Sequence, residues 1–175
     1  MPIAGVIAWS AVALFGMFLS PPNAARSAWI LFIATGSIMP LGLSISRLTG
    51  ENLTDRNKPK NSFDSLFYSG LLAALLVYAI ALPFFVEEPS SLPLSVGILT
   101  GLMWPPLSWI INHWVGYFHS ISRTVMVFAA WYIFPTHRFV AIPIVIVAIY
   151  LITIVVLEKR WRALQVQHSE HSSLA

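Results

Sequence analysis

The sequence contains no cysteine and few charged residues. Without cysteine, disulfides, thiolate metal sites, iron–sulfur clusters and cysteine nucleophiles are excluded. Charged residues make up only 10% of the 175 positions, whereas an average soluble domain has roughly 25%. The chain therefore falls outside the soluble globular class, and few polar side chains remain for chemistry.

Catalytic signatures are also missing from the sequence. It contains no His-Glu-x-x-His, no Gly-x-Ser-x-Gly, no Walker-type loop and no dinucleotide-binding fingerprint. No group of histidines and carboxylates has the spacing of a zinc site. We therefore expect neither a cofactor nor a metal ion, and no catalytic residue is assigned.

Long apolar segments fill most of the chain. Hydrophobic residues account for 57% of the sequence and the mean hydropathy is +0.76. A membrane-spanning helix needs about 20 apolar residues, and the alternation typical of a membrane β-barrel is not seen. We predict an all-α, polytopic bundle in one domain (residues 1–157), followed by a polar cytoplasmic tail (158–175). The predicted spans are residues 3–19, 29–46, 63–86, 94–111, 115–134 and 139–157.

The distribution of lysine and arginine predicts the orientation of this bundle, because positive charges accumulate on the cytoplasmic side. With six spans, one side receives Arg47, Arg56, Lys58, Lys60, Arg123, Lys159, Arg160 and Arg162. The other side receives Arg26 and Arg138, together with Glu87 and Glu88. We therefore expect both termini in the cytoplasm and a location in the bacterial inner membrane. The basic surplus indicates contact with lipid headgroups rather than nucleic acid.

Two of the predicted spans share the pattern Thr-Gly-x-x-x-Pro, beginning at Thr35 and Thr100. Proline and glycine can interrupt a helix, and paired interruptions indicate a transporter-type binding site. Small residues at such spacing also allow two helices to pack closely. Gly97 and Gly101 have the Gly-x-x-x-Gly spacing that is typical of packed membrane helices. Packing has the more direct support, and both interpretations stay open. The candidate break or hinge positions are Gly36, Pro40, Gly101, Pro105 and Pro106.

His113, His119 and Arg123 form the one cluster of ionisable residues that stands out in the spans. Small and polar residues recur there at steps of three and four, which places them on one helix face: Gly116, His119, Ser120, Arg123, Val127 and Ala130. This face should meet protein or water rather than lipid. Arg123 then either extends to the cytoplasmic headgroups or joins the histidines in binding an anion, a lipid phosphate or a proton path.

Three functions are compatible with these residues. We favour a transporter, permease or lipid translocator for a small or anionic solute, working through the interrupted helices and the His113/His119/Arg123 cluster. We expect its path at a homo-oligomer interface or at the junction between the two interrupted helices. The alternative is an accessory or assembly subunit that packs against a membrane partner. The third is a membrane-embedded enzyme acting on a lipid phosphate, which fits worst because no carboxylate accompanies the histidines.

Overall fold

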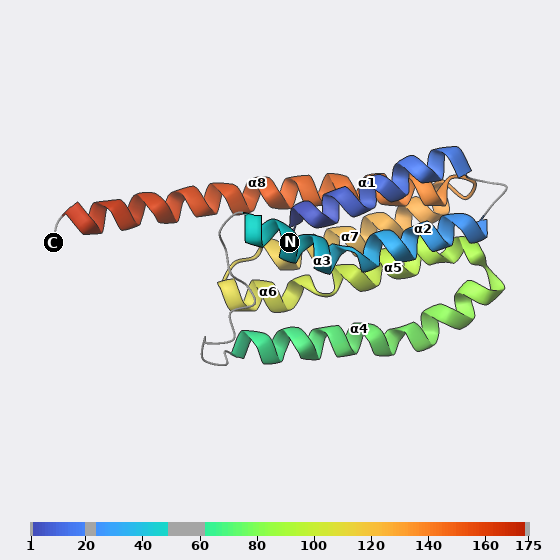
Figure 1. The fold of residues 1–175 in the computed structure, drawn as a ribbon, viewed down its shortest axis with the longest axis horizontal. Helices are drawn as coiled ribbons and strands as arrows, with labels where there is room; N and C mark the ends of the chain where they lie inside the picture. The colour runs from blue at the N-terminus through green and yellow to red at the C-terminus, as the bar shows by residue number, and fades with distance from the viewer. Residues whose placement is uncertain (1, 20–23, 49–61, 174–175) are drawn as a thin grey trace.

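The structure is a computed structural model that describes residues 2–19, 24–48 and 62–173. Every regular element in this part of the chain is helical (Figure 1). The elements are α1 (Pro2–Leu19), α2 (Ala24–Gly36), α3 (Ile38–Leu48), α4 (Ser62–Glu87), the 3-10 turn η1 (Pro89–Ser91), α5 (Leu92–Gly101), α6 (Trp104–Ile111), α7 (Val115–Ile133) and α8 (Arg138–Ser173).

These elements fall where the apolar segments predicted helices, so the all-helical class is confirmed. Three helical stretches are long and apolar enough to cross a membrane: Ala25–Leu48, Pro89–Ile111 and Arg138–Val166. Shorter apolar helices cover Pro2–Phe18 and Leu75–Glu87. This composition fits a membrane protein, in which each backbone donor must be satisfied within its own helix.

Helices are interrupted near both Thr-Gly-x-x-x-Pro patterns. Between α2 and α3 only Ser37 leaves the helix, and its amide still donates to Ile33 O at 2.9 Å. The second interruption is wider, because α5 ends at Gly101 and α6 begins at Trp104. Pro105 lies in the first turn of α6. Backbone N–H groups of the first turn have no carbonyl partner within the helix, so a proline, which lacks an N–H, is tolerated there.

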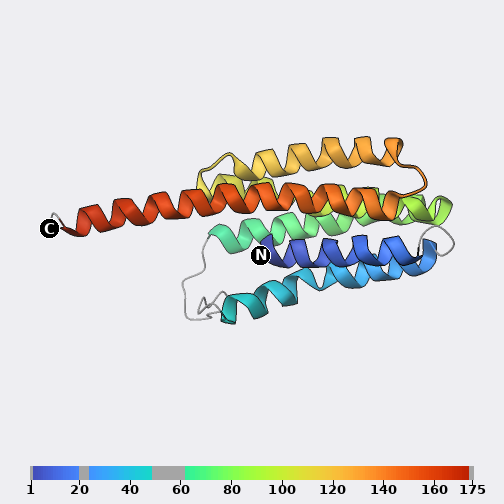
Figure 2. The ribbon, with the colours of Figure 1, turned by 90° about the horizontal axis from the view of Figure 1, so that it is seen from above.

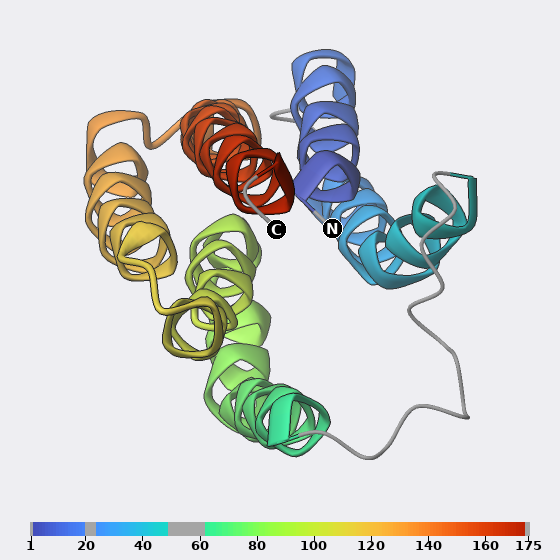
Figure 3. The same cartoon turned by 90° about the vertical axis from the view of Figure 1, so that its left-hand side faces the viewer.

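The helices form an open arrangement around α8. Figure 3 shows them end-on, with α8 lying between α1 and α7, and α4 at the outer end of the row that continues through α5. Contacts between α1 and α8 are the most extensive in the described chain, followed by those between α7 and α8. The helix α4 packs against α5, α6 and η1. Its remaining surface exposes large apolar side chains, among them Leu72, Leu76 and Ile80.

The segment after residue 157, which the sequence marks as a polar tail, is helical. The helix α8 continues without a break to Ser173 and extends well beyond the other helices (Figures 1 and 2). The 16 residues after Leu157 contain neither glycine nor proline, so nothing in the sequence ends the helix. An ion pair one turn apart, from Arg162 Nε to Glu158 Oε1 at 2.9 Å, adds local support.

Candidate functional site

The small and polar face of α7 points into the bundle, as the sequence predicted. Its six members are all buried: Gly116, His119, Ser120, Arg123, Val127 and Ala130. Arg123 has no exposed surface, and it lies eight residues, or roughly 12 Å, from the start of α7 at Val115. Its side chain ends inside the protein, which disagrees with the first of the two alternatives for Arg123, extension to the headgroups.

Arg123 is held by the end of α5. Its Nε donates to the carbonyl oxygen of Gly97 at 2.6 Å, and its Nη2 donates to the Thr100 hydroxyl. The Thr100 hydroxyl in turn donates to Val96 O at 2.8 Å. A Cβ atom at Gly101 would lie only 2.9 Å from Arg123 Cδ. The second interrupted helix therefore ends against the arginine, and glycine is required there for close approach.

Two aromatic rings lie beside the guanidinium. Arg123 Cζ is 5.2 Å from the ring centre of Trp9 in α1 and 5.4 Å from that of Tyr150 in α8. Both rings are buried. Cation–π contacts of this kind contribute about 0.5–1 kcal/mol when exposed and about 2 kcal/mol or more when desolvated. At Gly5 a Cβ atom would lie 2.5 Å from Tyr150 Cζ, so a second glycine makes room for the Tyr150 ring.

His119 completes the same cluster. Its Nδ1 lies 2.8 Å from Thr153 Oγ1, and the Thr153 hydroxyl donates to Ile149 O at 2.8 Å. Because that hydroxyl proton is already used, Nδ1 must be the donor of the pair, which leaves Nε2 with a lone pair directed at Arg123 Nη1, 3.5 Å away. The imidazole stacks on Trp104, with ring centres 4.1 Å apart and an interplanar angle of 21°. His119 is therefore a neutral, fixed acceptor.

The cluster has more donors than acceptors. The guanidinium has five N–H groups, and its hydrogen-bond partners are Gly97, Thr100 and His119, with the Tyr150 hydroxyl as a further side-chain partner. The buried indole Nε1 of Trp9 has no hydrogen-bond partner among the described residues. Ion pairs in that part of the chain join Arg138 to Glu88 and Arg162 to Glu158, and neither involves Arg123. This surplus of buried positive charge and N–H groups is suited to an anion.

The structure separates the other predicted residues from this cluster. His113 lies in the turn between α6 and α7, where its Nδ1 accepts from Val115 N at 3.3 Å and its ring stacks on Trp114. Gly36 has open space at its Cβ position and contacts nothing there. Thus Gly101 takes part in the site, whereas Gly36 and Pro40 mark a separate interruption and Pro105 and Pro106 begin the helix α6.

A second polar cluster lies at the far end of α7. Arg138 Nη1 donates to the Ser90 hydroxyl and lies 3.9 Å from Glu88 Oε1, and its guanidinium stacks 3.9 Å from the ring centre of Trp131. Hydrogen bonds from the Ser90 hydroxyl and amide, and then the charge of Arg138, lower the pKa of Glu88 below its ordinary value. These contacts join η1 to the α7–α8 turn. Among the described residues, the hydrogen bonds and ion pairs of Arg138 do not involve the partners of Arg123.

Sequence reasoning missed four partners of the cluster: Trp9, Trp104, Tyr150 and Thr153. Trp9 stands in the middle of a predicted span, away from the interfaces where tryptophan is enriched, and this position was an available signal. Tyr150 and Thr153 are three residues apart in an otherwise aliphatic helix, which places both on one face. In the described residues, no three His, Asp or Glu side chains gather in a way that could hold a metal ion.

Comparison with known proteins places the chain in a family without giving it an activity. No curated protein and no solved structure matches it. The sequence profile of one family matches residues 1–160, which is most of the chain. The chain therefore belongs to the family described as a family of unknown function, DUF7010.

Proposed function

We propose that this protein is a transporter of the bacterial inner membrane that moves a small anion bearing a carboxylate or phosphate group. In this proposal six helical segments cross the membrane, with α2–α3 and α5–α6 each counting as one interrupted span, and both termini lie in the cytoplasm. The proposal is supported by three stretches of spanning length and apolarity and by the lysine and arginine surplus on one side.

The observation that best supports anion transport is the complete burial of Arg123 without a carboxylate partner in the described chain. A charge at the centre of a bilayer costs about 2.5–3.5 kcal/mol by insertion scales. The Trp9 and Tyr150 rings and three hydrogen bonds offset part of that cost. Arginine presents a planar set of donors that matches carboxylate and phosphate oxygens, so an anionic solute is the natural partner for the remaining charge.

The location of Arg123 beside the end of α5 supports movement rather than static binding. Transporter sites commonly use interrupted helices whose ends meet the substrate. Here the carbonyl of Gly97 and the hydroxyl of Thr100 hold the guanidinium just before the interruption. A change in the angle between α5 and α6 would alter these bonds directly.

The enzyme hypothesis has the least support from the geometry. The Nδ1 of His119 donates to Thr153, its Nε2 faces Arg123, and Trp104 covers the ring. No carboxylate in the described residues contacts it, so a general acid or base role lacks the orienting group that such histidines use. An accessory subunit remains the alternative that the experiment must separate from transport.

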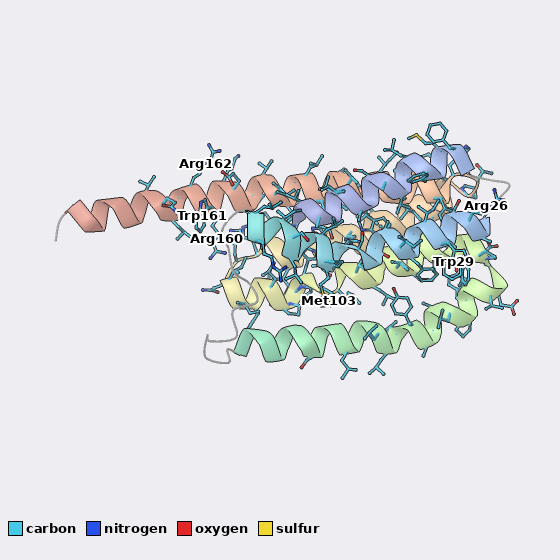
Figure 4. All side chains as sticks on the ribbon, in the orientation of Figure 1. Arg26, Trp29, Met103, Arg160, Trp161 and Arg162 are labelled. Atoms are coloured by element: carbon cyan, nitrogen blue, oxygen red, sulfur yellow. The ribbon has the colours of Figure 1, made fainter. Side chains whose placement is uncertain are left out.

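Reconstitution into liposomes provides the test. Uptake of radiolabelled acetate, lactate and inorganic phosphate is measured for the parent protein, Arg123→Gln and Arg123→Lys. Arg26→Gln serves as the matched control, because Arg26 is exposed at one end of the bundle (Figure 4). We expect uptake of at least one anion, at least a tenfold loss with Arg123→Gln, a partial loss with Arg123→Lys, and less than a twofold change with Arg26→Gln.

Other outcomes point to other functions. Equal uptake by the parent protein and Arg123→Gln would refute the role of Arg123. Uptake of no anion, together with a membrane protein that co-purifies in fixed ratio, would favour the accessory subunit. Hydrolysis of a lipid phosphate that disappears with His119→Gln would favour the enzyme.

A further inference from the structure

An open groove lies where α8 leaves the bundle, and none of the residues that line it belongs to the Arg123 cluster. It has a volume of about 640 Å³ and is formed by the start of α1, the end of α6 and the middle of α8. Ligand pockets commonly measure about 300–1,000 Å³. The walls are mainly aliphatic and include Ile3, Ile111, Ile154, Leu157 and Leu164.

The mouth of this groove carries an arginine that forms no ion pair with a carboxylate of the described residues, although Glu158 also lines the groove. Arg160 lines the groove and donates from Nη2 to the carbonyl oxygen of Ile111, which is a neutral acceptor. The neighbouring Glu158 is paired with Arg162, with 2.9 Å between Oε1 and Nε. Its charge is therefore already balanced within one turn of α8. The remaining N–H groups of Arg160 can meet an anion at the groove.

The residues around the mouth are those of a membrane interface. Trp161 lines the groove with 59% of its surface exposed, and Figure 4 shows Arg160, Trp161 and Arg162 on α8 just where it leaves the other helices. Tryptophan is enriched at the level of the headgroups, and lysine and arginine follow on the cytoplasmic side. Below this level α8 is apolar for about 20 residues, from Phe139 to Leu157.

We propose that this groove is a binding site for an anionic phospholipid of the cytoplasmic leaflet. One acyl chain lies along Ile111, Ile154 and Leu157, on the membrane side of Arg160, and the headgroup phosphate accepts hydrogen bonds from Arg160. The inference rests on the membrane orientation proposed above but not on transport. A second copy of the chain is a poor occupant, because a symmetric contact would bring two clusters of Lys159, Arg160 and Arg162 together.

Lipid binding is measured by native mass spectrometry of the full chain released from detergent, with phosphatidylglycerol and with phosphatidylcholine of the same acyl chains. The headgroup contact is tested with Arg160→Gln, and its control is Arg47→Gln, which removes an exposed positive charge from α3. The groove is tested with Leu157→Trp, which fills it. Its control is Leu151→Trp, at an exposed position of the same helix.

We expect phosphatidylglycerol to bind at least fivefold more tightly than phosphatidylcholine. Arg160→Gln should abolish that preference, Leu157→Trp should weaken both lipids at least fivefold, and each control should change binding less than twofold. Inorganic phosphate in tenfold excess should not displace the lipid, because it cannot occupy the groove.

Three results would overturn the assignment: equal affinity for the two lipids, equal effects of Leu157→Trp and Leu151→Trp, or displacement by inorganic phosphate alone. A dimer that forms on delipidation and is lost with Leu157→Trp would assign the groove to a second copy instead. Because Arg160 also holds the end of α6, Arg160→Gln can unfold that turn. In that case the comparison of Leu157→Trp with Leu151→Trp tests the proposal alone, because neither leucine side chain forms a hydrogen bond that the substitution would remove. A failure of anion uptake would leave these lipid measurements unaffected, so the two proposals fail separately.

Discussion

The two glycines of the Thr-Gly-x-x-x-Pro pattern should respond in opposite directions to the same substitution. Alanine at Gly36 meets no atom within 4 Å, whereas alanine at Gly101 would place its Cβ 2.9 Å from Arg123 Cδ and 3.3 Å from Arg123 Nε. The Arg123 side chain cannot simply rotate away, because its Nε is bonded to Gly97 O at 2.6 Å. The overlap must therefore displace the arginine or separate α5 from α7.

The magnitudes follow from these contacts. Replacing glycine by alanine in a helix stabilises by roughly 0.5–1 kcal/mol, so Gly36→Ala should raise the apparent melting temperature by about 1–4 °C, at about 2–4 °C per kcal/mol for a chain of this size. Overpacking a core costs typically 1–3 kcal/mol. For Gly101→Ala the two effects oppose each other, and the expected net loss is about 1–2 kcal/mol, or roughly 2–8 °C.

Intrinsic tryptophan fluorescence during heating in lipid nanodiscs provides the assay, because the chain has seven tryptophans. Arg123→Ala removes the atoms with which the new methyl group would collide. In that background Gly101→Ala should lose most of its destabilising effect, with a coupling of about 1 kcal/mol or more. Equal melting temperatures for Gly36→Ala and Gly101→Ala, or an additive double variant, would refute the packing of Arg123 on Gly101.

Three further predictions concern other parts of the bundle. Gly116→Ala should destabilise by about 3 kcal/mol or more and lower the yield of folded protein, because its Cβ would lie 2.3 Å from the backbone oxygen of Trp104; an unchanged melting temperature would contradict this contact. Hydrogen bonds from Ser90 lower the pKa of Glu88, so its carboxylate stabilises the fold at neutral pH, and that contribution is lost as pH falls through the lowered pKa. The melting temperature of Glu88→Gln should therefore fall less steeply with decreasing pH than that of the parent protein. Identical pH dependence of the two melting temperatures would refute this role of Glu88. In this cysteine-free chain, a membrane-impermeant maleimide should label Glu88→Cys but not Lys58→Cys in intact cells, and the reverse pattern would invert the proposed orientation.

The all-helical class could be predicted from the sequence, whereas the continuation of α8 to Ser173 was not predicted. Apolar segments and the Gly36 and Gly101 patterns act locally, so their effect on the backbone can be predicted without knowing which helices are neighbours. The burial of the α7 face was also predictable, since the spacing of His119 and Arg123 is a property of one helix.

The partners of that face were not predictable from the sequence in the same way. Trp9, Gly97 and Tyr150 come from three other helices, and their approach to Arg123 depends on how those helices cross. His113 is also a histidine and lies only six residues before His119, but Asn112 between α6 and α7 adopts a left-handed conformation with φ of 48°. This turn ends α6 and directs the chain so that His113 stays apart from His119.

The bond between Arg123 and Gly97 has a consequence for how binding can be controlled. Arginine keeps its proton throughout the physiological pH range, so the positive charge inside the bundle cannot be switched off by acid or base. What can vary is the number of N–H groups still free on the guanidinium, and the backbone of α5 occupies one of them. If Arg123 binds an anion as proposed, tilting α5 at the interruption after Gly101 would release that N–H group to the solute. Helix geometry, rather than protonation, would then set the affinity.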